Sequence, residues 1–317
     1  MSKASLMPVP IDQKLIQAFG NLEFIAKQVV EGFITGLHKS PFHGFSVEFS
    51  EHRPYNQGES IRHIDWKLYG RSDKLYTKRF EEETNLRCQI IIDNSSSMYY
   101  PVAKDITVNH PNKIIFSIYA AAALIYLLRL QRDAVGLSVF SETVEEHKSA
   151  RSSMAHQKII YHSLEKMLHA YEEGSNKKTF AAEALHQIAE IIHKRSLVVI
   201  FSDMMESNAH TDDLFTALQH LKHNKHEIIL FHVTDKSKEL DFTFENRPYR
   251  FIDMENGDEI KLNPAEIKNQ YLEAINKFRG ELKLRCGQYR IDLVEADINE
   301  GFHHVLLSYL LKRERMF

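Results

Sequence analysis

The chain has 317 residues, an apolar fraction of 43% and a formal net charge of −3. This length and apolar content suffice for one large folded domain with a smaller appendage. The near-neutral charge disfavours a general affinity for nucleic acid or acidic membranes, and the first ten residues lack the apolar core of a signal peptide. We therefore expect a cytoplasmic protein with no membrane span and no nucleic-acid partner.

The first 86 residues scatter glycine, proline and aromatic residues among short alternating segments. The alternation predicts strands over residues 44–49 and 74–80. We expect residues 1–86 to contain an N-terminal helix and a small β-rich region, and residues 87–317 to form a larger domain.

From residue 87 onward, apolar strand patterns alternate with helical patterns, which indicates a mostly parallel sheet with helices on both faces. We expect an α/β fold with a doubly wound sheet, and an inserted segment with two short strands near 236–262. The apolar helix over 114–130 is too short to cross a bilayer. The expected strands are 88–92, 133–140, 143–147, 196–201, 227–233 and 289–294, and the other expected helices are 154–171, 180–193, 212–223, 264–286 and 301–313.

Oxygen-bearing side chains follow the first strand of this domain. Asp93, Ser95 and Ser97 come directly after the apolar run 88–92, at the strand end where open α/β sheets bind ligands. Hard divalent cations such as Mg²⁺ prefer this oxygen set. A purely structural alternative is that Asp93 caps the next helix and the serines fill a loop.

Two later turns also carry oxygen-bearing side chains. The apolar strand 197–201 runs straight into Ser202 and Asp203, and Thr179 lies at the start of the helical stretch 180–193. Thr179 is therefore either an N-cap or a hydroxyl ligand. Two carboxylates at the ends of two strands strengthen the prediction of a cation site.

An aspartate with two serines, then a threonine, then a second aspartate, each at a turn, resembles the metal-ion-dependent adhesion site of von Willebrand factor A-like domains. The resemblance implies a Rossmann-like fold and a site for Mg²⁺, or for Mn²⁺ or Ca²⁺. This sequence differs from the usual pattern of the family in two places, since Met204 and Lys178 stand where relatives often carry glycine. The implied ligands are Asp93, Ser95, Ser97, Thr179 and Asp203.

A second set of motifs lies before this site. Tyr55, Gly58, Glu59 and Arg62 precede Ile64-Asp65-Trp66, and a basic strand with Leu75, Lys78 and Arg79 follows, with acidic residues at 81–83. Together with the adhesion-type site, this order resembles the bacterial family known as domain of unknown function 58. Glu59 and Gly70 are mild departures, where relatives commonly have aspartate and alanine. The resemblance covers residue 40 to the end and implies a MoxR-type AAA+ ATPase as partner.

Charged residues around these motifs admit two interpretations. In the first interpretation, a buried ion pair fixes the N-terminal region, formed by Asp65 with Arg53, Arg62 or Arg71. In the second, these arginines line a docking surface for an acidic partner. Lys177 and Lys178 precede Thr179, and they are either solvated loop charges or charges that steer an anionic group toward the cation.

Two functions fit such a site. In the first, the protein is not an enzyme but a cation-dependent binding module, in which the ion leaves one position open for an Asp or Glu carboxylate of a partner or client. In the second, the ion serves a hydrolase or phosphatase with Asp93 as nucleophile. We favour the first, because a phosphoaspartate enzyme is expected to carry a second carboxylate where this chain has Ser95.

Overall fold

The computed structural model describes residues 22–37, 52–54, 69–71, 75–78, 86–102, 107–168, 181–205, 211–314 and 316. Contacts within the chain define two units, of which the larger combines residues 1–39 with 86–317 and the smaller comprises residues 40–85. The expected division after residue 86 placed the N-terminal helix with the β-rich region. In the structure this helix, α2 (Leu22–Leu37), packs against the α/β unit instead.

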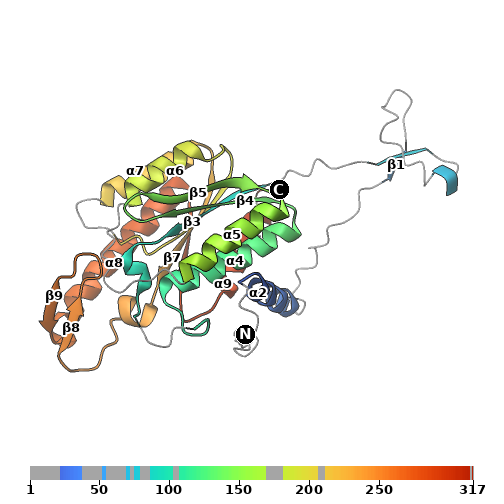
Figure 1. Cartoon of the computed structure of the whole chain (residues 1–317). Helices are drawn as coiled ribbons and strands as arrows, with labels where there is room; N and C mark the ends of the chain where they lie inside the picture. Colours follow the sequence, from blue (N-terminus) through green and yellow to red (C-terminus); the bar gives the residue numbers. More distant parts are fainter. Residues whose placement is uncertain are drawn as a thin grey trace, which may run out of the picture. The chain divides into compact units, whose positions relative to one another are not determined.

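A six-stranded sheet forms the centre of the larger unit (Figure 1). Its order is β10-β7-β6-β3-β4-β5, and all neighbours are parallel except the β4–β5 pair at one edge. Counted along the chain, these strands have the order 3-2-1-4-5-6 of doubly wound folds. The predicted α/β fold class is confirmed. The strands are β3 (Arg87–Asp93), β4 (Ala134–Phe140), β5 (Val144–Arg151), β6 (Leu197–Ser202), β7 (Glu227–Thr234) and β10 (Asp292–Asp297).

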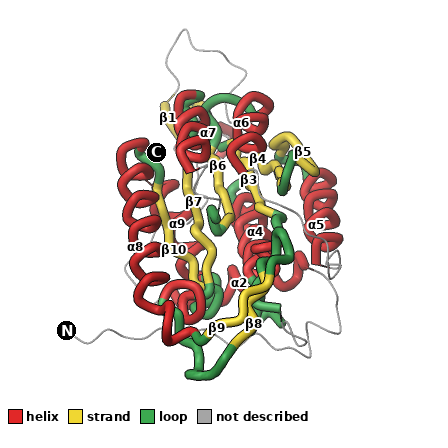
Figure 2. Tube along the Cα trace, turned by 90° about the vertical axis from the view of Figure 1, so that its left-hand side faces the viewer, coloured by secondary structure: helices red, strands yellow, loops and turns green. Residues whose placement is uncertain are grey.

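Helices cover both faces of the sheet, as the alternating pattern predicted (Figures 1 and 2). One face packs against α4 (Lys113–Leu130), α5 (Met154–Leu168) and α9 (His303–Glu314), with α2 against α4. The other face packs against α6 (Ala181–Ile191), α7 (Thr211–His223) and α8 (Pro264–Tyr289). The central strands are therefore buried on both sides, which explains why β3, β6 and β7 are continuously apolar rather than alternating.

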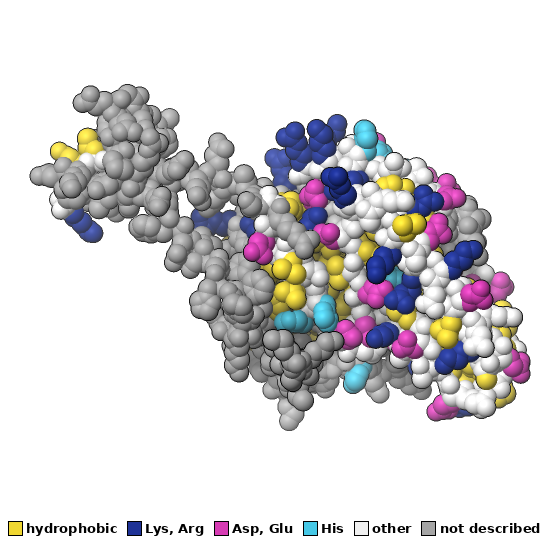
Figure 3. All heavy atoms as spheres, turned by 180° about the vertical axis from the view of Figure 1, so that it is seen from behind, with side chains coloured by type: hydrophobic (Ala, Val, Ile, Leu, Met, Phe, Trp, Pro, Cys, Tyr) yellow, Lys and Arg dark blue, Asp and Glu magenta, His cyan; other side chains and the backbone are white. Residues whose placement is uncertain are grey.

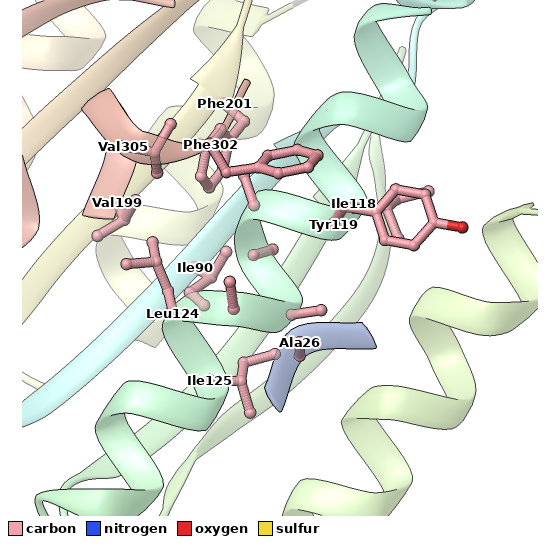
Figure 4. Close-up of a cluster of buried hydrophobic side chains, with 14 of the residues drawn as sticks. Ala26, Ile90, Ile118, Tyr119, Leu124, Ile125, Val199, Phe201, Phe302 and Val305 are labelled. Carbon is pink, nitrogen blue, oxygen red and sulfur yellow. The ribbon is translucent and has the colours of Figure 1, made fainter. Parts of the chain in front are cut away.

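Helix α4 is apolar around its whole circumference because it is enclosed on all sides. Figure 4 shows Leu124 and Ile125 of α4 among side chains from the sheet, from α2 and from the region of α9. Each fully buried side chain of this size contributes about 1.5–3 kcal/mol to stability. Among the described residues α4 alone has the length and apolar character of a membrane span, and 83% of that stretch is buried within the fold.

The segment between β7 and α8 carries the expected pair of short strands. A short π-helix, η3 (Lys236–Leu240), precedes the antiparallel hairpin of β8 (Tyr249–Ile252) and β9 (Glu259–Leu262). The connection is longer than a two-residue Asn-Gly turn, although Gly257 does adopt a left-handed φ of 77°. The last strand, β10, begins three residues later than predicted, because α8 continues to Tyr289 and ends in a left-handed C-cap at Arg290.

The described part of the smaller unit contains an antiparallel pair, β1 (His52–Pro54) with β2 (Tyr76–Lys78). β2 lies within the strand expected over 74–80, whereas β1 was not predicted. The strand expected over 44–49 lies outside the described residues.

The surface of the larger unit carries no extended field of one charge on the face that Figure 3 shows. Acidic and basic side chains occur together across its described part, with apolar side chains scattered among them. This mixture agrees with the near-neutral net charge of the sequence.

Candidate functional site

The two aspartates singled out in the sequence meet at the point where the strand order reverses. β3 pairs with β4 on one side and with β6 on the other, and Asp93 ends β3 while Asp203 directly follows β6. Open α/β sheets bind ligands at this switch point, outside the carboxyl ends of the strands. Asp93, Ser95 and Asp203 are completely buried there.

Asp93 is held by both neighbouring loops. Its Oδ1 accepts a hydrogen bond from the Ser95 backbone N–H at 2.9 Å, and its Oδ2 accepts one from the Ser202 hydroxyl at 2.6 Å. The first contact forms a local turn. It is not the helix cap that the structural alternative for Asp93 expected, because Ser95 is the N-cap of the 3-10 turn that follows. The second contact joins the last residue of β3 to the last residue of β6, so Asp93 also fixes the two strand ends relative to each other.

The serine hydroxyls extend this cluster toward Asp203. Ser95 Oγ lies 3.1 Å from Ser97 Oγ, and the Ser97 side chain is among the groups that lower the pKa of Asp203. Ser97 lies in a single 3-10 turn, η2 (Ser96–Tyr99), that begins right after Ser95. The structure thus brings together four of the five predicted ligands, namely Asp93, Ser95, Ser97 and Asp203.

The loop after β6 adopts an unusual backbone conformation. Met204 has a φ of 51°, in the left-handed region that favours glycine. A methionine holds this conformation at a cost of about 1–2 kcal/mol, because its Cβ lies close to the following carbonyl oxygen. The Met204 N–H donates to Ser202 Oγ at 2.9 Å. Strain of this kind persists where the surrounding contacts enforce it, and it is common at binding sites.

A lysine that the sequence analysis did not select completes the cluster. Lys113, the first residue of α4, is buried, and its Nζ donates to Asp203 Oδ2 at 2.7 Å and to Glu239 Oε1 at 2.6 Å. Glu239 comes from η3, after β7. A sequence signal for Lys113 existed, because it begins an otherwise apolar helix. Glu239 gave none, since it lies in a polar segment.

The carboxylates respond differently to this environment. Burial and the neighbouring Asp203 charge raise the pKa of Asp93 to about 7. Burial would also raise the pKa of Asp203, but the Lys113 ammonium outweighs it and the pKa is lowered. The pKa of Glu239 is raised, because burial outweighs the attraction of Lys113. Only when all three carboxylates are ionised does their negative charge exceed what Lys113 neutralises.

Two features of the cluster fit a divalent cation. Adjacent ligands of an octahedral Mg²⁺ with bonds of 2.0–2.1 Å are about 3 Å apart, which matches the 3.1 Å between the Ser95 and Ser97 hydroxyl oxygens. In addition, the Lys113 ammonium contacts the carboxylates of Asp203 and Glu239, while Asp93 lies close enough to Asp203 for the two charges to repel. Two negative charges therefore remain when all three carboxylates are ionised. Ser95 and Ser97 would hold the ion directly, and Asp93 and Asp203 directly or through water.

The remaining predicted site residues are not part of this described cluster. Thr179, Lys177 and Lys178 lie outside the described residues, as do Arg62 and Asp65 of the N-terminal motif. Arg71 is described and is exposed. Its exposure disagrees with the buried ion pair that the sequence offered as one alternative, and its predicted role in partner binding stays a prediction.

Comparisons with known proteins identify relatives without an established activity. The uncharacterized protein Rv1480 of Mycobacterium tuberculosis is 24% identical over 194 residues, which are 61% of this chain and 58% of that protein. The same figures apply to the uncharacterized protein Mb1516 of Mycobacterium bovis. The chain therefore spans less than two thirds of the length of these relatives.

Among solved structures, BatB from Bacteroides thetaiotaomicron is 15% identical, with a TM-score of 0.41 over 73% of this chain and 98% of BatB. The von Willebrand A domain of SpRpn10 is 12% identical, with a TM-score of 0.35 over 71% of this chain and 94% of that domain. The family described as protein of unknown function DUF58 matches residues 51–280, which include the site. The chain is a member of the DUF58 family.

Proposed function

We propose that this protein is a non-enzymatic, divalent-cation-dependent protein-binding module that serves as an adaptor for a MoxR-type AAA+ ATPase. The observation that carries the proposal is the pair of serine hydroxyls between two buried aspartates at the switch point of the sheet. Hydroxyl ligands add no negative charge, so a bound Mg²⁺ keeps a strong affinity for an incoming carboxylate. The partner or client would supply that carboxylate from an Asp or Glu side chain.

One residue of the cluster, Ser97, is partly exposed, and this supports a ligand that arrives from outside. Asp93, Ser95 and Asp203 are fully buried, whereas Ser97 is partly exposed. A carboxylate of another protein would therefore reach the ion from the side of Ser97. The choice of a MoxR-type ATPase rests on the family resemblance, and the geometry supports only the chemistry of the contact.

The geometry gives less support to the alternative, a metal-dependent hydrolase or phosphatase. Both carboxylate oxygens of Asp93 already accept hydrogen bonds, from Ser95 and Ser202, and this arrangement suits a fixed supporting carboxylate better than a nucleophile. The neighbouring His232 donates from Nε2 to the Asp203 backbone oxygen, and burial lowers its pKa to about 4. Turnover of a phosphoester with Mg²⁺ or Mn²⁺ that disappears in Asp93→Asn would favour the hydrolase.

The binding proposal is tested by association of the purified full chain with the MoxR-type ATPase of the same organism. We expect Ser97→Ala to weaken the Mg²⁺-dependent association at least tenfold, because it removes a ligand of the ion. Ser96→Ala is the matched control, since Ser96 lies between the two hydroxyl ligands but outside the predicted ligand set. The measurement is immobilised binding in Mg²⁺ and, separately, in chelator.

The serine comparison is essential here, because a chelator also removes Mg²⁺ from the ATPase itself. Wild type and Ser96→Ala should bind alike in Mg²⁺. If Ser97→Ala bound as well as these two chains, or if wild type retained the ATPase fully in chelator, the cation would have no part in the contact and the proposed mechanism would be wrong.

A further inference from the structure

Lys113 occupies a position that is unfavourable for a lysine in two respects. It is the first residue of α4, where the positive end of the helix dipole repels a cation. It is also 1% exposed, and it is the only fully buried lysine or arginine in the described part of the chain. A buried ammonium is retained only where nearby anions compensate for its lost hydration.

The compensating anions are Asp203 and Glu239, at 2.7 and 2.6 Å from Lys113 Nζ. The two carboxylates belong to different elements, since Asp203 follows β6 and Glu239 lies in η3 after β7. Of these two carboxylates, Asp203 is the one whose pKa the Ser97 side chain also lowers. Lys113 therefore shares one carboxylate with the candidate cation site and has a second one outside it.

We propose that Lys113 is a built-in counter-cation that competes with the divalent ion for Asp203 and so sets the affinity of the site. The inference rests on the proposed function, because it concerns the same site. Without the ion, the ammonium neutralises Asp203 and Glu239 together. With the ion bound, the negative charge of Asp203 would compensate the ion instead of Lys113, and Lys113 would keep Glu239 as its partner.

Glu239 is placed to serve as this second partner. Its Oε2 accepts a hydrogen bond from the Asp235 N–H at 2.7 Å, while its backbone oxygen accepts one from the Tyr271 hydroxyl of α8 at 2.8 Å. These contacts hold the glutamate in position independently of Asp203. The competition therefore needs no rearrangement of the segment that carries Glu239.

Substitutions at the two ends of this ion pair should change cation affinity in opposite directions. Lys113→Met removes the competitor and should raise the affinity for Mg²⁺ at least tenfold. Glu239→Gln leaves Asp203 as the only charged partner of Lys113 and should lower the affinity at least threefold. Calorimetric titration of the full chain with Mg²⁺ alone measures both effects.

Lys312→Met is the matched control. Lys312 also bonds two carboxylates, Glu227 at 2.7 Å and Asp292 at 3.0 Å, but these residues begin β7 and β10 at the opposite end of the sheet. The control should leave Mg²⁺ affinity unchanged. A second readout is urea unfolding, in which Lys113→Met should unfold at lower urea than wild type in chelator and recover in Mg²⁺.

The outcomes separate this inference from the proposed function. If wild type binds Mg²⁺ and Lys113→Met binds no more tightly, the competition is refuted while the binding module stands. If neither chain binds, both proposals fail. If only Lys113→Met binds, the competition is supported and the wild-type module is refuted. Should Lys113→Met fail to fold, Glu239→Gln decides, and unchanged or tighter binding by that variant refutes the competition.

Discussion

Replacing Asp93 with asparagine is expected to stabilise the cation-free protein at pH 8 by up to about 4 kcal/mol. The pKa of Asp93 is raised from its ordinary 3.8 to about 7, and each unit of such a shift corresponds to about 1.4 kcal/mol. At pH 8 the folded chain must hold this carboxylate ionised in a buried position. Asparagine has nearly the same shape and carries no charge, so the cost disappears.

The sign follows from proton linkage. Between pH 4 and pH 7 the folded state binds this proton more tightly than the unfolded state does, so the contribution of Asp93 to stability falls as the pH rises and stays low above pH 7. Urea unfolding in chelator at pH 5 and pH 8 should show a higher free energy of unfolding for Asp93→Asn than for wild type, mainly at the higher pH. His232 titrates in both chains, so the difference between them isolates Asp93.

The opposite result would be informative. If Asp93→Asn were less stable than wild type at pH 8 by 1 kcal/mol or more, the hydrogen bonds from Ser95 and Ser202 would outweigh the buried charge. The unbalanced negative charge that supports a divalent cation would then be absent.

Asp203→Asn is expected to act in the other direction and to lower the free energy of unfolding by about 3–5 kcal/mol. The substitution removes one of the two carboxylates that compensate the buried Lys113 ammonium. A loss of this size is a large share of the 5–15 kcal/mol that is typical of a domain. The measurement is the same urea unfolding in chelator at pH 7.

The control for Asp203→Asn is an exposed ion pair. Arg250 and Glu259 lie on the hairpin with 58% and 45% of their side chains exposed, and Glu259→Gln should cost less than about 1 kcal/mol. Equal losses in the two variants would mean that the Lys113–Asp203 pair contributes no more than a surface pair. Two aspartates of one site with opposite effects on stability would be hard to explain without the charge distribution described here.

The features that could be predicted from the sequence are those that depend on local pattern. The apolar runs before Asp93 and Asp203 identified both strands, and the strand–helix alternation predicted the sheet class. Because parallel strands end at the same edge of a sheet, the convergence of Asp93, Ser95, Ser97 and Asp203 also followed from these patterns. The start of β10 was misplaced, since α8 continues past Gly287 to Tyr289 and no proline or glycine follows directly to mark the stop.

The features that could not be predicted depend on long-range packing. Lys113 is 90 residues from Asp203 and 126 from Glu239, and nothing in its local sequence indicates that both carboxylates approach it. Helix α2 packs against α4 although the chain between them contains the whole smaller unit. The left-handed backbone at Met204 was not predicted either, because methionine rarely adopts this conformation.

The central claim is that hydroxyl and carboxylate oxygens from separate turns hold one divalent cation. The most direct test is a titration of the chelator-treated full chain with Mn²⁺, followed by the electron paramagnetic resonance signal of the free ion. We predict that each chain removes one Mn²⁺ from solution, that Mg²⁺ displaces it, and that Ser95→Ala loses this binding. A free-ion signal that wild type does not reduce, or that Ser95→Ala reduces equally, would contradict the claim.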